Sequence, residues 1–147
     1  MKFYQEPNAD NVGAKPALDF VYLTTHAAVT EGSVYAMDLT TATVANLGQV
    51  TTSKAGPDGA LEANVWIVAM ESKGSGETAK FAVKGYVKIL AGSGGLSAGD
   101  AASADGSAGV ITAPANDVVI ALAPAAISAA ATGYVWFDGT GFYLKGA

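Results

Sequence analysis

The sequence predicts an all-β domain, either a small β-barrel or a β-sandwich, with one short Ala-rich helix and an extended N-terminal arm. Three observations support this prediction. About ten short runs of apolar or β-branched residues are separated by Gly- and Pro-containing turns, which is typical of sandwiches and barrels. Residues 80–89 alternate between lysines and apolar residues, as a strand with one wet face does. The length of 147 residues is that of one ordinary domain.

Residues 1–17 form the predicted arm, because they are polar, lack periodicity and contain Pro7, Gly13 and Pro16. Residues 18–147 form the predicted single β-rich domain. The arm carries Phe3 and Tyr4, which suggests a strap that orders on docking, by adding a strand to the sheet edge of a partner protein.

The first half of the domain contains strands predicted at 18–23, 33–38, 41–47 and 61–71, with a loop at 53–59 that holds a Gly-Pro and an Asp-Gly pair. In residues 80–89, Lys80, Lys84 and Lys88 fall at even positions, whereas the large apolar residues fall at odd ones. Alternate side chains of a strand point to opposite faces, so the lysines are expected on a solvated face or on a guarded sheet edge.

In the second half, the small-residue tract 92–109 predicts connected turns with little core. Strands are expected at 110–113 and 117–123. Residues 124–132 predict the helix, since Pro124 suits a first helical position, five alanines follow and Gly133 ends the run. Residues 134–137 and 142–145 flank the sequence DGTG, which predicts a β-hairpin.

The composition argues against several classes of function. Only 14% of the residues are charged, against about 25% in an average domain. A formal net charge of −5 is unfavourable for nucleic-acid binding, whose affinity comes largely from Lys and Arg on phosphates. The chain has no cysteine, so disulfides, thiolate nucleophiles and Cys-ligated metals are excluded.

The N-terminus lacks the apolar run of a secretory signal, so we expect synthesis and retention in the cytosol. Residues 118–137 are twenty residues without a charge. Alanine drives membrane insertion poorly and Pro124 interrupts the run, so two non-membrane elements joined by a turn are expected there.

No catalytic, cofactor or metal site is predicted. The sole histidine, His26, has no spaced Ser and carboxylate that would complete a triad. Asp100, Asp105 and Asp117 lack the ligand spacing of a calcium loop. The sequence does not determine the distance between the carboxylates of Glu62 and Glu71, so it does not support a glycosidase pair. The Gly-rich runs lack the Lys-Ser/Thr of a phosphate loop.

The aromatic residues are the best candidates for an interaction site. Tyr134 and Trp136 share one face of their strand while residues 135 and 137 share the other, and most of the aromatics are expected in the core. An apolar second face must be covered by the same chain or by a neighbouring subunit, and such a weakly charged surface favours association. The predicted capsid or subunit interface comprises Phe3, Tyr4, Tyr134, Trp136, Phe142 and Tyr143.

Four short stretches also carry a family resemblance: 31–38 (EGSVYAMD), 82–88 (AVKGYVK), 96–100 (LSAGD), and 119–123 (VIALA) leading to 131–136 (ATGYVW). In this order they resemble the small decoration, or cement, proteins on the heads of tailed bacteriophages. The resemblance spans roughly residues 30–145. It implies a β-barrel-like fold, often trimeric, that binds the major capsid protein outside the head and reinforces capsomer junctions without catalysis or a cofactor.

Two alternatives stay open at this point. The chain could be a tail component or another minor virion structural component. It could also be a barrel that binds a small molecule in a cavity lined by its aromatic cluster. An enzyme is the weakest candidate, because no nucleophile–base pair is visible in the sequence.

Overall fold

The computed structural model describes residues 18–25, 27–38, 43–47, 65–104 and 109–146, and these form an all-β fold. No helix occurs in these ranges, and therefore none that is long and apolar enough to cross a membrane. The strands are β1 (Asp19–Thr24), β2 (Val34–Asp38), β3 (Thr43–Leu47), β4 (Val65–Ala69), β5 (Thr78–Leu90), β6 (Ala101–Ala104), β7 (Val110–Thr112), β8 (Val118–Val119), β9 (Ala121–Leu122), β10 (Thr132–Asp138) and β11 (Tyr143–Leu144).

Nine of the strands form one sheet in the order β1-β3-β2-β4-β5-β10-β9-β6-β7, and β8 pairs with β11 in a second, two-stranded sheet. β1 also pairs with β5, so the first five strands of the order close into a ring. The contact between β1 and β3 is narrow, a single pair at Thr24 and Thr43. The barrel-like architecture predicted from the sequence is therefore confirmed.

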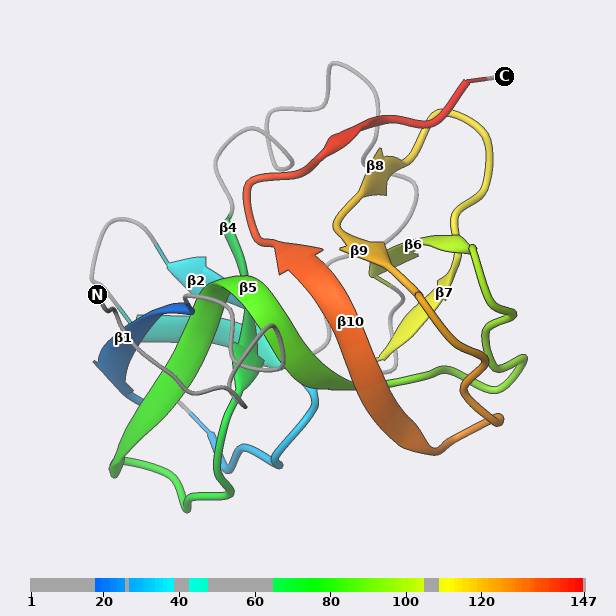
Figure 1. The fold of residues 1–147 in the computed structure, drawn as a ribbon. Coiled ribbons are helices and arrows are strands. Elements are labelled where there is room, and N and C mark those ends of the chain that lie inside the picture. The colour runs from blue at the N-terminus through cyan, green and yellow to red at the C-terminus, as the bar shows by residue number, and fades with distance from the viewer. Residues whose placement is uncertain (1–17, 26, 39–42, 48–64, 105–108, 147) are drawn as a thin grey trace, which may run out of the picture.

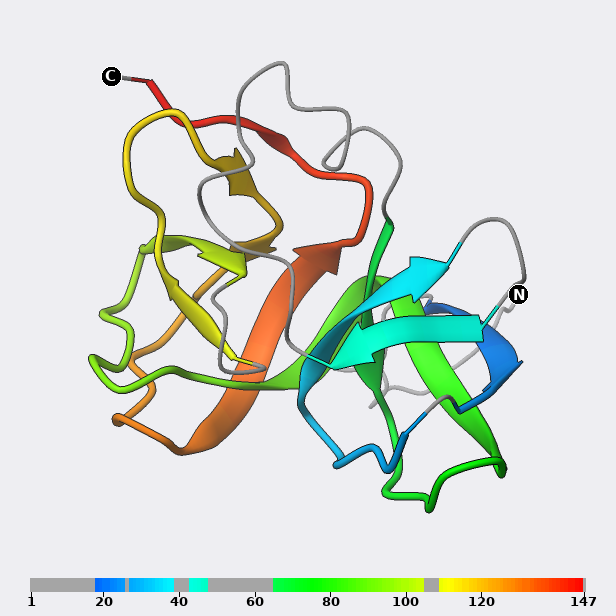
Figure 2. The ribbon, with the colours of Figure 1, turned by 180° about the vertical axis from the view of Figure 1, so that it is seen from behind.

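The long strand β5 links the two halves of the molecule. It curves from the ring on one side to β10 and the remaining strands on the other (Figure 1). Seen from behind, β2 and β3 lie at the ring end while β6 and β7 form the opposite end (Figure 2). β5 is not a sheet edge, because β4, β1 and β10 all pair with it. Of the two predictions for its lysines, the guarded edge is wrong.

Two clusters of buried side chains stabilise the fold. The smaller one fills the ring and includes Tyr35, Ile67 and Phe81. The larger one lies between the ring and the second half, and includes Val68, Ile89 and Phe137. β2 and β4 supply alternate side chains to both clusters, which is why they are apolar on both faces. The larger cluster therefore joins buried side chains from both halves.

The predicted Ala-rich helix at 124–132 is wrong. Ile127 instead forms a two-way backbone bridge with Leu96, in which the N–H of each residue donates to the carbonyl oxygen of the other at 2.8 and 2.9 Å. Ala130 adopts a left-handed conformation with φ of 59°. A helix of nine residues has little stability of its own, so these tertiary contacts determine the conformation.

The predicted hairpin between 134–137 and 142–145 is also wrong. β10 is already paired on both edges, with β5 and with β9. The chain therefore turns away after Asp138, and β11 pairs with β8 through Tyr143–Val119 and Leu144–Val118. The DGTG sequence does form a turn, in which the N–H of Gly141 donates to the carbonyl oxygen of Asp138 at 2.9 Å.

The small-residue tract contributes more than turns. Ala101–Ala104 form β6 between β7 and β9, and Ala102, Ser103 and Ala104 are buried there. Alanine has a low intrinsic strand propensity, but its small side chain allows close packing in the interior. The strand predicted at 117–123 is divided into β8 and β9, which belong to different sheets.

Candidate functional site

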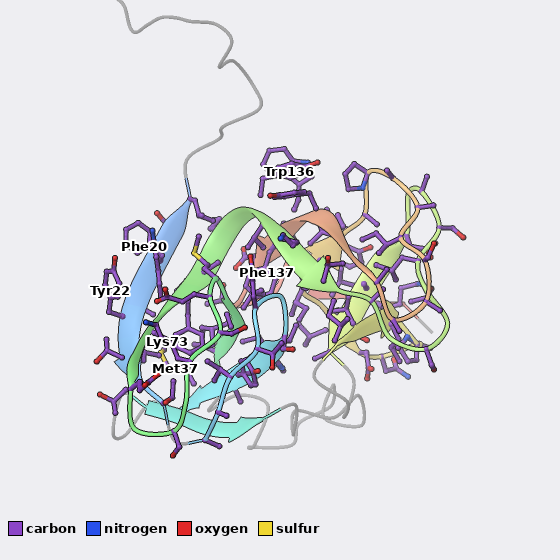
Figure 3. All side chains as sticks on the ribbon, turned by 90° about the horizontal axis from the view of Figure 1, so that it is seen from below. Phe20, Tyr22, Met37, Lys73, Trp136 and Phe137 are labelled. Carbon is purple, nitrogen blue, oxygen red and sulfur yellow. The ribbon has the colours of Figure 1, made fainter. Side chains whose placement is uncertain are left out.

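The second face of β10 is exposed, as the alternation of its sequence predicts. Val135 and Phe137 are buried in the larger cluster, whereas Tyr134 and Trp136 are 53% and 44% exposed. Figure 3 shows Trp136 pointing outward and Phe137 lying inside the molecule. The outer face of β10 therefore presents two partly exposed aromatic side chains.

An aromatic row follows the pairing of β5 and β10; it consists of Tyr134, Tyr86 and Trp136. The register places Tyr86 opposite Trp136 and Lys88 opposite Tyr134. The Tyr86 ring stacks on Tyr134 with centroids 5.4 Å apart and is tilted against Trp136 at 4.9 Å. Such ring pairs contribute about 0.5–1.5 kcal/mol each beyond their burial, so the row is ordered before any partner binds.

A second feature, the junction pocket, lies beside the row. Lys84 is opposite Asp19, the first residue of β1, and also opposite Asp138, the last residue of β10. The backbone hydrogen bonds of Glu77, Val83 and Ala91 place β1 and β10 one after the other along the same edge of β5. The junction between the two strands is therefore a break in an otherwise continuous edge.

The junction pocket has a volume of about 390 Å³. Its floor and walls are mainly apolar, and charged side chains occur only in Asp19 and Lys84. The lining residues are Asp19, Lys84, Gly85, Leu122, Trp136, Phe137 and Phe142. Gly85 has φ of 131°, a conformation that residues with a side chain rarely adopt, so glycine is required at this bend of β5.

Two lysines of β5, Lys84 and Lys88, form ion pairs near the aromatic row. The Lys84 Nζ is 3.9 Å from Asp138 Oδ2, and the Lys88 Nζ is 3.3 Å from Glu31 Oε2. Exposed pairs of this kind contribute little to stability, about 0–1 kcal/mol. Because each lysine faces a carboxylate, the surroundings of the row carry no strong net charge. Both lysine side chains are exposed, at 64% and 38%, so the prediction that they lie on a solvated face is confirmed.

A further aromatic pair lies on the outer side of β1. The Phe20 and Tyr22 rings meet edge to face with centroids 5.8 Å apart, and Lys80 Nζ lies 4.1 Å from the centre of the Phe20 ring. Both side chains are exposed and point outward in Figure 3.

The structure brings together only part of the predicted interface. Tyr134 and Trp136 share the aromatic row, and Phe142 joins Trp136 in the junction pocket. Tyr143 is exposed on β11 and does not line that pocket. Phe3 and Tyr4 lie outside the described residues.

The prediction that most of the aromatics in this set are in the core is wrong. Of Trp66, Tyr134, Trp136, Phe137, Phe142 and Tyr143, only Trp66 and Phe137 are buried. Sequence reasoning also missed Tyr86, Phe20 and Tyr22. Tyr86 stands at an even position between Lys84 and Lys88, so the alternation that placed the lysines in solvent could have found it.

Two of the acidic residues considered in the sequence analysis accept hydrogen bonds from neighbouring residues of the fold. Asp100 Oδ2 accepts hydrogen bonds from the Ser97 N–H at 2.8 Å and from the Thr112 hydroxyl at 2.9 Å. Glu71 Oε2 accepts from the Lys80 N–H at 3.0 Å. His26, Glu62 and Asp105 lie outside the described residues. Within the described ranges, no three His, Cys, Asp or Glu side chains gather as metal ligands would.

Among the described residues, Asp117 is a buried acid, only 5% exposed. Burial raises the pKa of its carboxyl above the ordinary value of 3.8, and the hydrogen bond from Ser103 Oγ to Oδ2, at 3.4 Å, lowers that pKa only in part. Between the ordinary pKa and the raised pKa of the folded protein, the folded state holds a proton that the unfolded state has released. Stability therefore falls as pH rises from the ordinary pKa through the raised one.

We expect Asp117→Asn to raise the thermal midpoint relative to the original protein at neutral pH, because the amide avoids the burial of a charge. The difference between the two midpoints should shrink as pH falls below the raised pKa, because the original carboxyl then becomes protonated in the folded protein. Thermal unfolding of both proteins across this range measures the difference. A difference that does not change with pH would show that the burial of Asp117 has no linked proton.

Comparison with known proteins identifies the fold. No family model matches the sequence, and no curated protein matches it. Among solved structures, the chain is similar to the N base of head fiber gp8.5 in bacteriophage phi29, with a TM-score of 0.56 and 11% sequence identity. The similarity covers 86% of this chain and 99% of that chain, so the two share an overall fold and not merely a motif.

Proposed function

We propose that the protein is a structural protein of a bacteriophage virion that binds the outside of the head. Its partner would be the major capsid protein, and its contacts would stabilise capsomer junctions, as in a decoration or cement protein. The observation that carries this proposal is the fold shared with the base of a head fiber over 99% of that chain. The motif resemblance to decoration proteins points to the same class.

The exposed aromatics supply the contact surface in this proposal. Tyr and Trp are enriched in protein interfaces and among the residues that dominate binding energy. The set comprises Phe20, Tyr22, Tyr134, Trp136, Phe142 and Tyr143, each between 38% and 61% exposed. At roughly 150–250 Å² per aromatic side chain, about half of it exposed, the six offer on the order of 600 Å².

That area is smaller than the ~800 Å² per partner of a standard interface. A single copy would therefore make a modest contact, and several linked copies would bind far more tightly through avidity. We accordingly propose a homo-oligomer, with a trimer favoured by the family resemblance. The role is mechanical and not catalytic: the protein holds neighbouring shell subunits together.

Localisation on particles tests the proposal against its main alternative, a tail or other minor virion component. Antibodies raised against the protein and coupled to gold are expected to label the heads of intact virions by electron microscopy. Label on tails would assign the protein to the alternative. Absence of label from all particles, with the protein found only in the lysate, would remove both.

A further inference from the structure

The junction pocket has the chemistry of a site for an aromatic side chain. A 150 Å³ apolar cavity is large enough to bind benzene, so a pocket of about 390 Å³ can hold one or two aromatic rings. Specific sites for small molecules combine apolar walls with several convergent polar groups. Here only Asp19 and Lys84 are charged, and Lys84 is engaged with Asp138 at 3.9 Å. The pocket thus suits a ring from a polypeptide better than a polar metabolite.

The position of the pocket in the chain indicates which polypeptide. Asp19 lines the pocket and is also the first residue of β1, so the described chain begins next to the pocket. The segment before β1 carries two adjacent aromatics, Phe3 and Tyr4. Its four charged residues cancel to a formal charge of zero, so no electrostatic repulsion opposes docking; they are Lys2, Glu6, Asp10 and Lys15.

We propose that the junction pocket binds one aromatic ring of the Phe3–Tyr4 pair from the same chain. Tyr4 and Asp19 are fifteen positions apart, and the root-mean-square span of an unstructured chain of that length is about 20–25 Å. A covalent tether of this length gives an effective concentration in the millimolar range at the pocket, which a free second molecule matches only in concentrated solution. The arm would reach a shell protein only after leaving the pocket.

Engineered disulfides test this proposal directly, because the chain has no cysteine of its own. Tyr4→Cys combined with Phe142→Cys places one thiol on the arm and one in the pocket wall. The control combines Tyr4→Cys with Tyr22→Cys, since Tyr22 is 61% exposed on β1 and does not line the pocket. An arm without a preferred site would close the two pairs to similar extents, because in both cases the same segment between Tyr4 and β1 tethers the arm thiol to the folded domain.

In a glutathione redox buffer, the Phe142 pair is expected to form its intramolecular disulfide with an effective concentration at least tenfold above that of the Tyr22 pair. Mass spectrometry and non-reducing gels measure the fraction closed. Equal closure, or preference for the control, would overturn the proposal. Disulfides that join two chains would overturn it as well, because the occupant would then be a second copy.

A second measurement leaves the pocket intact, in case Phe142→Cys itself disturbs it. Trp66 is buried and Trp136 is partly exposed in the pocket wall, so acrylamide quenching reports mainly on Trp136. The Phe3→Ser/Tyr4→Ser protein is expected to show about twofold stronger quenching than the original, because a docked ring shields the indole from contact with acrylamide. Tyr22→Ser is the control and should leave quenching unchanged. Equal quenching in all three proteins would contradict docking.

Discussion

Replacing Gly139 with alanine is expected to destabilise the fold by about 3 kcal/mol or more. A Cβ at this position would overlap the carbonyl oxygen of Trp66 and lie 3.0 Å from that of Val83. The glycine cannot move away, because its N–H donates to Val83 at 2.8 Å and its carbonyl oxygen accepts from the Trp66 N–H at 2.9 Å. Relief of the overlap would therefore break the contacts that hold the end of β10 against β4 and β5.

Gly94→Ala is the matched control, since nothing lies within 4 Å of an added Cβ there and Gly94 is not among the positive-φ glycines. It should change stability by no more than about 0.5 kcal/mol. Urea unfolding followed by circular dichroism gives both values. Similar losses in the two variants would mean that the turn after β10 does not approach β4 as described.

Replacing Phe137 with alanine is expected to cost about 3–5 kcal/mol, the usual range for removing a buried phenylalanine. Phe137 is 1% exposed and packs in the larger cluster. Its neighbour Trp136 has a larger side chain but projects from the outer face of the same strand. Trp136→Ala should therefore cost much less, mainly the contact with Tyr86, about 0.5–1.5 kcal/mol.

The two variants together test the register of β10, because a shift of one residue would exchange the faces of the strand. Urea unfolding of Phe137→Ala and Trp136→Ala, measured under the same conditions, gives the comparison. A larger loss of unfolding free energy in Trp136→Ala than in Phe137→Ala would show that Trp136 is on the buried face of β10. The aromatic row would then not be on the surface.

The features that the sequence predicts correctly are local ones. Period-two alternation identifies both faces of β10 and of the second half of β5, because it depends only on the geometry of a single strand. The same rule implies an exposed Tyr86 between two solvated lysines. The all-β class follows from many short strands and turns, and it does not require knowledge of how they pair.

The errors concern contacts between distant residues. The turn at 138–141 is present, as the sequence predicts. The strand after it could pair with β10 only if β10 had a free edge, and β5 and β9 already pair with both edges. The segment at 124–132 has helical composition, yet its bridge to Leu96 outweighs a weak local preference. The junction pocket was equally invisible, because it exists only where β1 and β10 meet along β5.

Addition of the purified protein to heads assembled without it tests the central claim most directly. The original protein is expected to sediment with such heads and to raise the temperature at which they disrupt. Tyr134→Ser/Trp136→Ser should bind less and raise that temperature less, while remaining folded, because both side chains lie on the outer face. Folded original protein that neither sediments with the heads nor changes their disruption temperature would contradict the account.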